Sequence, residues 1–398
     1  MKNILKYTAT ALLAASMFTA CTGAFDDLNT DPKGVSDEEL KQDNNYIGMH
    51  FIPMMQSIYY NNGGGTNPWE YQLIQNLNAD MWSGYVSTAT AFAGNVNNIT
   101  YAMNAGWNDN CWDYAYNHVM SQSLKITRKC EKDMETYSHF AAINTICRVI
   151  AMSRLTDQYG CIIYTHYGES ATGGTYDSGQ DVYKKFFEEL REAADELRAV
   201  KDKDVASFAP FDYAYGGDLN KWAKLCNTIR LRLAMRIVYA DPATARTMAE
   251  SAVSHEIGVM TSNDDNACMT SFGADGNPIY VAVNYNSATH SDNTACLTGG
   301  DSHAAADIIC YMNAYNDPRR AAYFVESEWP GQTYVGMRRG IEIPDLSSIG
   351  HKYSGVKLTT SSPLYWMNAA EVAFLKAEAK AVFGFDMGSG SAEDFYNE

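Results

Sequence analysis

Apolar residues recur at intervals of three and four along much of the chain, which is the spacing of helices with one buried face. The clearest case is residues 181–200, where Phe186, Leu190 and Leu197 share a face. In residues 219–239 an apolar face lies opposite a basic one. The same pattern predicts further helices over residues 37–59, 69–82, 108–132, 137–157, 242–253, 301–316 and 362–384.

Residues that start or stop helices support this assignment. Asp241 followed by Pro242 is typical of an N-cap and a first helical residue. Pro363 and Gly384 are expected near the start and just past the end of the last long helix. Lys184 and Glu188 stand four residues apart, which predicts an ion pair along the helix.

The stretches between these helices lack a sustained period. Residues 83–107 and 325–362 are predicted to be mostly ordered loop, and residues 279–285 alternate weakly, which favours one short strand. No 34-residue repeat is visible, but paired helices of this size suit a TPR-like stack. The predicted fold class is mainly α, with TPR-like helix hairpins, long ordered loops and little β structure.

The first twenty residues have the features of an export signal. Lys2 and Lys6 precede an apolar run over residues 7–20, which is shorter than the ~20 residues that a membrane-spanning helix needs. The sequence Phe-Thr-Ala-Cys that ends at Cys21 resembles a lipobox. We therefore predict a signal peptide over residues 1–20 and a Cys21 whose acyl chains hold the protein at a membrane. An ordinary signal with a chance cysteine is the alternative.

The composition narrows the range of binding partners and metal ions to be expected. The 398 residues contain 30 Lys and Arg against 47 Asp and Glu, a net charge of −17, and the signal removes only lysines. This charge repels phosphate backbones, so nucleic acid is not an expected partner. Of nine cysteines no two form a C-x-x-C pair, so a zinc site has no support. Whether any disulfide forms is left open, although the position of Cys147 and Cys226 in helical patterns favours buried free thiols.

Signatures of catalysis and of cofactor binding are missing. The chain has no HExxH, P-loop, G-x-G-x-x-G or G-x-S-x-G motif, and neither an enzyme activity nor a cofactor is predicted. The run at residues 263–266 could hold Ca²⁺ but lacks the spacing of an EF-hand loop. A basic cluster on one helix is expected to pair with acids on neighbouring helices, and it consists of Arg230, Arg232 and Arg236.

Several segments, in order, resemble the SusD/RagB family, and in particular its SusD-like-2 branch. The lipobox is followed by FDDLNTDP, then by LTDQYGCIIYTHY, in which Ile163 stands where the family usually has proline. The segment LNKWAKLCNTIRLRLAMRIVYADPATA is the nearest match. The order is completed by YDSGQDVYKKFFEELREAADEL before it and by NPIY, NDPRRAAYF and SPLYWMNAAEVAFLKAEAKAVFG after it.

The resemblance implies an outer-membrane lipoprotein exposed at the cell surface. Such a protein captures a nutrient, most often an oligosaccharide, for import through a SusC-type TonB-dependent transporter. It also implies that Asp317, Arg319 and Arg320 form a structural turn. We expect residues 1–20 to be the signal, 21–35 a lipidated tether, and 36–398 a single domain. Family chains usually continue beyond this point, so we expect the domain to be truncated at Glu398.

Glycans offer flat C–H faces and hydroxyl groups, so a site needs aromatic platforms and polar neighbours. The chain has 27 Tyr against 15 Phe, which favours half-exposed aromatics. The alternative functions are a lipid-anchored glycoside hydrolase and a helical protein-interaction scaffold. The candidates for ligand binding lie in two loop-rich stretches and are Trp69, Tyr71, Trp82, Tyr85, Phe92, Tyr280, Tyr285 and Asn286.

Overall fold

The computed structural model describes residues 37–59, 69–89, 94, 96–170, 173–272, 276–284, 302–342 and 352–398. Its internal contacts divide the chain into two units, Met1–Tyr46 and Ile47–Glu398. The described part of the first unit holds α3 (Asp37–Gln42) and the start of α4 (Asn45–Gly48). All other elements belong to the second unit. Cys21, with the rest of the predicted signal and tether, lies outside the described residues.

The single helix predicted over residues 37–59 is wrong in detail, because the segment forms three short helices. Asn44 has a left-handed backbone, with φ 58°, and separates α3 from α4. A second break at residues 49–50 separates α4 from α5 (Phe51–Ser57). A left-handed residue cannot continue a right-handed helix, so the apolar spacing runs on while the backbone does not.

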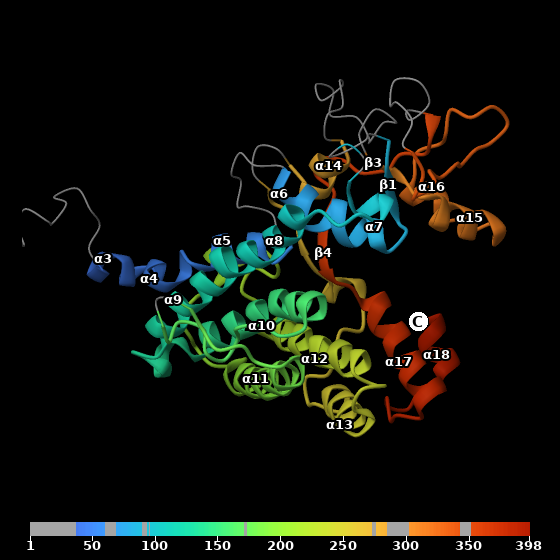
Figure 1. Cartoon of the computed structure of the whole chain (residues 1–398). Coiled ribbons are helices and arrows are strands. Elements are labelled where there is room, and N and C mark those ends of the chain that lie inside the picture. Colours follow the sequence, from blue (N-terminus) through green and yellow to red (C-terminus); the bar gives the residue numbers. More distant parts are fainter. Residues whose placement is uncertain are drawn as a thin grey trace, which may run out of the picture. The chain divides into compact units, whose positions relative to one another are not determined.

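Long helices that pack in succession form what we call the helix stack. Within it α10 contacts α9 and α11, α12 contacts α11, α13 and α17, and α17 contacts α18, as the lower part of Figure 1 shows. This arrangement confirms the predicted mainly helical class. Its elements are α9 (Ser121–Cys130), α10 (Met134–Tyr159), α11 (Gly179–Val200), α12 (Leu219–Arg236), α13 (Pro242–Val253), α17 (Ala369–Phe383) and α18 (Ala392–Asn397).

Side-chain caps explain where the stacked helices begin. The predicted cap at Asp241 is confirmed, since its carboxylate accepts the Thr244 backbone N–H at 3.1 Å. The helix after it ends at Val253 as expected. Gly384, with φ 64°, ends α17. The predicted pair of Lys184 with Glu188 is wrong: Lys184 lies 3.7 Å from Asp181, and the neighbouring Lys185 takes Glu188 instead.

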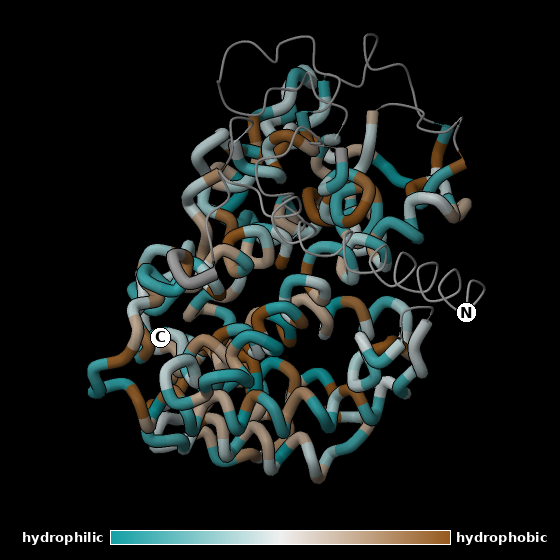
Figure 2. The backbone as a smooth tube through the Cα atoms, turned by 90° about the vertical axis from the view of Figure 1, so that its left-hand side faces the viewer, coloured by the Kyte–Doolittle hydropathy of each residue, from teal (hydrophilic) through white to brown (hydrophobic). Residues whose placement is uncertain are grey.

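Large aromatic side chains fill the interior of the stack. Trp222 on α12 is fully buried and lies near Trp366, Phe208 and Tyr215. Figure 2 shows apolar and polar stretches alternating along the turns of these helices, as expected when one face of each helix is buried. Cys147 and Cys226 are buried and free, and the other described cysteines are also free.

Two of the three predicted arginine pairs are present. Arg232 donates to Glu371 at 2.6 Å and Arg236 lies 2.7 Å from Asp157. The prediction for Arg230 is wrong. Its guanidinium is buried and donates to Asn227 and to Ser251, each at 2.9 Å, and burial lowers its pKa.

Short elements joined by long segments form the second part of this unit, which we call the loop region. In the upper part of Figure 1 its elements come from the blue, yellow and orange parts of the chain. Strand β1 (Val86–Thr88) pairs antiparallel with β3 (Ser302–Ala304). Its helices are α6 (Trp69–Tyr71), the π-helix η1 (Gln72–Ala79), α7 (Asp80–Trp82), η3 (Asn98–Thr100), α14 (Pro278–Val283), α15 (Ala306–Ala314) and α16 (Arg320–Tyr323).

The remaining elements connect these two parts. Strand β2 (Ala267–Met269) pairs antiparallel with β4 (Leu364–Met367), with an irregular register between Ala267 and Cys268. The helix predicted over residues 108–132 begins earlier, at Ala105, because the Asn104 side chain caps it. This helix consists of α8 (Ala105–Tyr114), the π-helix η4 (Ala115–Met120) and α9. Elsewhere in the chain two short 3₁₀ helices are present, η5 (Ala209–Phe211) and η6 (Asn263–Asp265).

Three further predicted elements are corrected. The described residues 279–284 of the predicted strand do not form one; α14 covers most of them, because the Asn277 side chain caps its first turn and Pro278 opens it. The helix predicted over 301–316 is shorter and follows strand β3. The last long helix begins at Ala369 with Asn368 as its cap, and Pro363 precedes strand β4 instead.

Candidate functional site

A wide cleft in the loop region is the candidate site, and we call it the tyrosine cleft. Its volume is about 1080 Å³, at the upper end of the ~300–1,000 Å³ usual for small-molecule sites. Six separate parts of the chain supply its walls: the residue Tyr59 after α5, the stretch from α6 to β1, α14, α15, α16 with the residue before it, and the segments around β4. The site therefore exists only in the folded loop region.

Exposed tyrosine rings dominate the rim of the cleft. Between 48% and 64% of each of four tyrosines is exposed, although all four line the same hollow. The floor is closed by Tyr71 and Phe324, which are almost fully buried. Rings that keep one face in water suit a ligand with flat apolar faces and polar edges. The four exposed rings are those of Tyr85, Tyr311, Tyr323 and Tyr365.

The charged groups at the cleft are paired within the protein. Both carboxylate oxygens of Asp307 accept from Arg339, at 3.0 and 3.1 Å, and this hydrogen bonding lowers the pKa of Asp307. Arg319 lies 2.5 Å from Asp317, whose pKa it lowers to about 2. Lys357 donates to the Ala321 carbonyl. A ligand would meet the charges of Asp307 and Arg319 already paired with opposite charges, whereas Lys357 is hydrogen-bonded only to a neutral carbonyl.

The wall below the rim is a chain of hydrogen bonds. Gln75 donates to Asp80 at 2.7 Å and accepts from Arg154, whose guanidinium lies 4.5 Å from the Tyr59 ring centre. The Tyr59 hydroxyl in turn donates to the Trp366 carbonyl at 3.0 Å. Burial raises the pKa of Asp80 to about 6. These contacts fix Gln75, which faces the cleft.

The predicted ligand-binding residues are only partly brought together. Tyr71 and Tyr85 line the cleft, whereas Tyr280 does not, although its neighbour Ile279 does. Trp82 is exposed and its ring lies 5.9 Å from that of Tyr101, outside the cleft lining. The other candidates are not described, since Phe92, Tyr285 and Asn286 lie outside the described residues and the side chain of Trp69 is not placed.

Four tyrosines that line the cleft were not among the sequence candidates, and they are Tyr59, Tyr311, Tyr323 and Tyr365. Three of them were assigned to predicted helices, and Tyr323 lies in a segment read only as a family motif. One signal was available in the sequence, because Tyr311 and Tyr315 are four residues apart in a predicted helix, and in the structure their rings are 4.9 Å apart at the end of α15. The motif around Asp317 forms the expected turn, since the Asp317 carboxylate accepts the Arg319 backbone N–H at 2.9 Å, but it also places Arg319 on the cleft wall.

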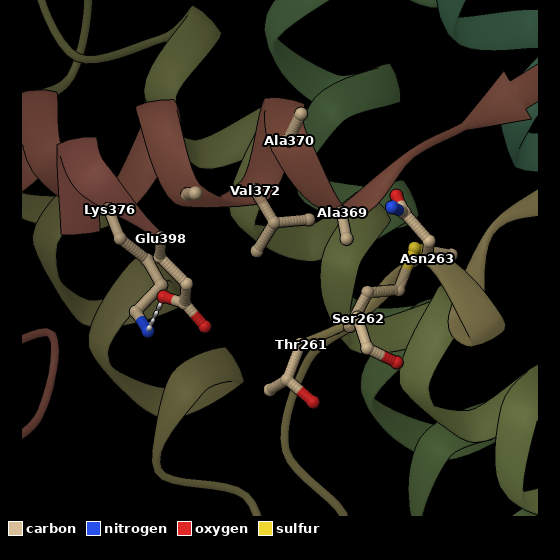
Figure 3. A pocket seen from close by; sticks show the side chains of 10 residues that line it. Thr261, Ser262, Asn263, Ala369, Ala370, Val372, Lys376 and Glu398 are labelled. Atoms are coloured by element: carbon tan, nitrogen blue, oxygen red, sulfur yellow. Dashed lines mark ion pairs between the residues drawn. The ribbon is translucent and has the colours of Figure 1, made fainter.

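A second hollow, of about 370 Å³, lies between residues 260–263 and α17. Figure 3 shows Lys376 and Glu398 next to each other at one end of it, where their charged groups are 3.9 Å apart, and Val372 and Ala369 toward the other end. None of the described residues that line it is aromatic. It therefore lacks the platforms that the tyrosine cleft offers.

The residues read as a possible calcium loop serve a different purpose. Asp265 is buried and accepts from Lys224 at 2.8 Å, and this lysine together with the Thr261 backbone lowers its pKa against the effect of burial. Among the described residues no three acidic, histidine or cysteine side chains gather as metal ligands would. In the same ranges no helix is long and apolar enough to cross a membrane.

Comparisons with known proteins give one consistent match. The family model described as "SusD-like: Susd and RagB outer membrane lipoprotein" matches residues 27–398. A SusD homolog from Bacteroides uniformis is 38% identical, with a TM-score of 0.76 over 88% of this chain and 68% of its own. A chitin-binding SusD homolog from Flavobacterium johnsoniae is 39% identical, with a TM-score of 0.77 over 88% and 69%.

A third solved structure, a SusD homolog from Bacteroides vulgatus, is 28% identical with a TM-score of 0.78, over 91% of this chain and 70% of its own. No curated protein sequence matches the chain. The three alignments cover 88–91% of this chain, so the similarity extends beyond the helix stack alone.

Proposed function

The chain belongs to the SusD-like family of outer-membrane lipoproteins, and on this premise we propose that it captures a glycan in the tyrosine cleft. The captured glycan is then passed to a SusC-type TonB-dependent transporter for import. The observation that carries the proposal is the set of four exposed tyrosine rings around one wide cleft.

The chemistry of the cleft supports a sugar as the ligand. A sugar ring presents C–H faces to an aromatic ring while its hydroxyl groups point sideways, and tyrosine offers both an apolar face and a hydroxyl. The relative from Flavobacterium johnsoniae, 39% identical, is described as chitin-binding. A polymer of acetylated sugars is therefore the first ligand to test.

The same cleft supports binding without cleavage. Glycoside hydrolysis usually needs two carboxyl groups across the bond, one of them able to donate a proton. Among the described lining residues of the cleft the only carboxylate is that of Asp307. Arg339 holds the pKa of Asp307 below its ordinary value, so this group stays ionised and is a poor acid.

A retention experiment tests the proposal. Purified protein is incubated with insoluble chitin and a panel of plant and host polysaccharides, and both depletion from solution and released sugar are measured. We expect retention by at least one polysaccharide and no product. Released sugar would show that the protein is a hydrolase and not only a binding protein. No retention by any polysaccharide would overturn the proposal.

Matched variants locate the binding to the cleft. Tyr311→Ala with Tyr323→Ala should lower affinity about tenfold or more, because anchoring aromatic side chains often contribute more than about 1 kcal/mol each. Tyr239→Ala is the control, since Tyr239 is 83% exposed and lies at the end of the stack, against Phe383. Equal affinities for the two variants would place the ligand elsewhere.

The anchor is tested separately. Cys21→Ala should move the protein from the membrane fraction to the soluble fraction, because the acyl chains would have no attachment point. Radiolabelled palmitate should enter the wild-type protein and not the variant. Continued membrane residence of the variant would contradict lipidation at Cys21.

A further inference from the structure

A smaller hollow adjoins the tyrosine cleft, and we call it the side hollow. Its volume is about 380 Å³, and Tyr101, Arg338 and Arg339 line it. Asp307 lines both the cleft and the side hollow. The two spaces are therefore neighbours divided by the Asp307–Arg339 ion pair.

This ion pair also fixes the end of α7. Besides its two bonds to Asp307, Arg339 donates to the carbonyl oxygens of Met81, at 2.5 Å, and of Trp82, at 3.4 Å. A planar guanidinium with several donors can hold a carboxylate and two carbonyls at once. One side chain thus connects α7 with the first turn of α15.

The turn after α7 then places one aromatic ring at each space. Gly84 has φ 78°, and a Cβ there would lie 3.1 Å from the Asp307 Cβ and 3.2 Å from the Arg339 Nη2, so glycine permits both the turn and the close approach. On one side of it Tyr85 lines the cleft. On the other side Trp82 lies beside Tyr101, which lines the side hollow.

Tyr101 is held in an unfavourable backbone conformation with its ring in solvent. It has φ 58° at the end of η3, and non-glycine residues in this region are uncommon. Its ring rests on Gly340, where a Cβ would lie 2.9 Å from the ring, and the Gly340 N–H donates to the Ile99 carbonyl. Even so, 62% of Tyr101 is exposed. Backbone strain retained under an exposed ring is typical of binding sites.

We propose that the tyrosine cleft and the side hollow form one extended site for an oligosaccharide longer than the cleft alone holds. Trp82 and Tyr101 form a shelf for the sugar units that pass beyond the Asp307–Arg339 ion pair, and Arg338 offers an exposed guanidinium for their oxygens. This inference rests on the proposed function and adds the ligand class, a long chain in preference to a mono- or disaccharide. The second contact is intramolecular once the cleft is filled, so it adds affinity for long chains.

Chain-length dependence tests the inference. The probes are chitin disaccharide, tetrasaccharide and octasaccharide, or the same lengths cut from whichever polysaccharide the protein retains, and affinity is measured by calorimetry. The wild-type protein should bind the octasaccharide about tenfold or more tightly than the tetrasaccharide. Tyr101→Asn removes the ring but keeps a residue that tolerates the left-handed backbone. It should lower octasaccharide affinity several-fold more than tetrasaccharide affinity.

Two further variants test the shelf and the ion pair individually. Trp82→Leu should reproduce the length-selective loss, and Arg339→Lys should do so as a positioning variant, because lysine cannot hold the carboxylate and both carbonyls together. Tyr239→Ala should retain the wild-type length preference. Retention of polysaccharide with equal affinity for the two lengths, or equal losses for both lengths in Tyr101→Asn, would overturn the extended site and leave the proposed function intact. No retention at all would overturn both.

Discussion

The helix stack and the loop region are stabilised by different kinds of interaction. In the stack, large apolar side chains such as Trp222 and Phe140 are fully buried between long helices. In the loop region, buried polar side chains hold the short elements: Asn98 donates to the Leu77 carbonyl and Ser302 to Asn76, each at 2.8 Å. Hydrogen bonds of this kind fix a loop without consuming its aromatic rings, which stay available for a ligand.

This difference between the two regions predicts where substitutions affect stability and where they affect binding. Burial stabilises in proportion to apolar area, so truncations in the stack should unfold the protein. A polar contact contributes little net free energy but is costly to leave half-made. Truncations of exposed rings in the loop region should change stability by no more than about 0.5 kcal/mol while changing affinity.

The largest expected effect is that of Trp222→Ala. The substitution leaves a cavity beside Trp366 and removes the indole donor to Asp212, at 2.8 Å. Buried tryptophan truncations cost about 3–5 kcal/mol, and we expect a loss of this size in the free energy of unfolding from urea denaturation. Tyr323→Ala is the comparison in the loop region. A loss as large for Tyr323→Ala would break the division between the two regions.

Asn277→Ala is expected to have the next largest effect, and it tests the polar side of the comparison. The Asn277 amide is buried, accepts the Ile279 and Tyr280 backbone N–H groups, and donates to the Ser362 carbonyl at 2.7 Å. Leaving such groups unpaired costs about 1–3 kcal/mol. Hydrogen exchange should accelerate at α14 and at residues 358–363 but not in α11.

Asn277→Asp is the matched variant, since it keeps the acceptor of the cap and loses the donor. Its loss should be smaller than that of the alanine variant, because the first turn of α14 stays capped. Uniform acceleration of exchange over both regions in either variant would show that the loop region does not open on its own.

The same contrast explains what the sequence could and could not predict. Helices of the stack follow from local information, since apolar spacing and a capping residue such as Asp241 are enough to place α13. Strand β4 was missed because its partner β2 lies about a hundred residues earlier in the chain, and local apolar content alone resembles a helix start. Pairing between distant segments has no local period.

The site was harder to predict for the same reason. Tyr85, Tyr311, Tyr323 and Tyr365 are brought together only by the folded loop region, and 27 tyrosines offer many other combinations. Composition indicated that half-exposed tyrosines exist. It could not select the four, because exposure depends on which neighbours cover each ring.

The smallest expected effect is that of Asp80→Asn, which sharpens the comparison inside the loop region itself. Burial raises the pKa of Asp80 to about 6, so ionisation is less favourable in the folded protein than in the unfolded chain, and stability falls as pH rises through 6. Asparagine keeps the acceptor for Gln75 without the charge. Because one pKa unit corresponds to about 1.4 kcal/mol and the side chain is partly exposed, we expect the variant to gain about 1 kcal/mol above pH 7.

This gain should shrink as pH falls toward 4, where Asp80 is protonated in the folded wild-type protein as well. Thermal denaturation of both proteins between pH 4 and pH 8 measures the difference. A gain that is constant over this range would mean that the charge of Asp80 costs nothing in the fold. A loss at pH 8 would mean that the carboxylate, through Gln75 and Arg154, stabilises the wall of the cleft. In that case the loop region would rely on a charge network as well as on neutral hydrogen bonds.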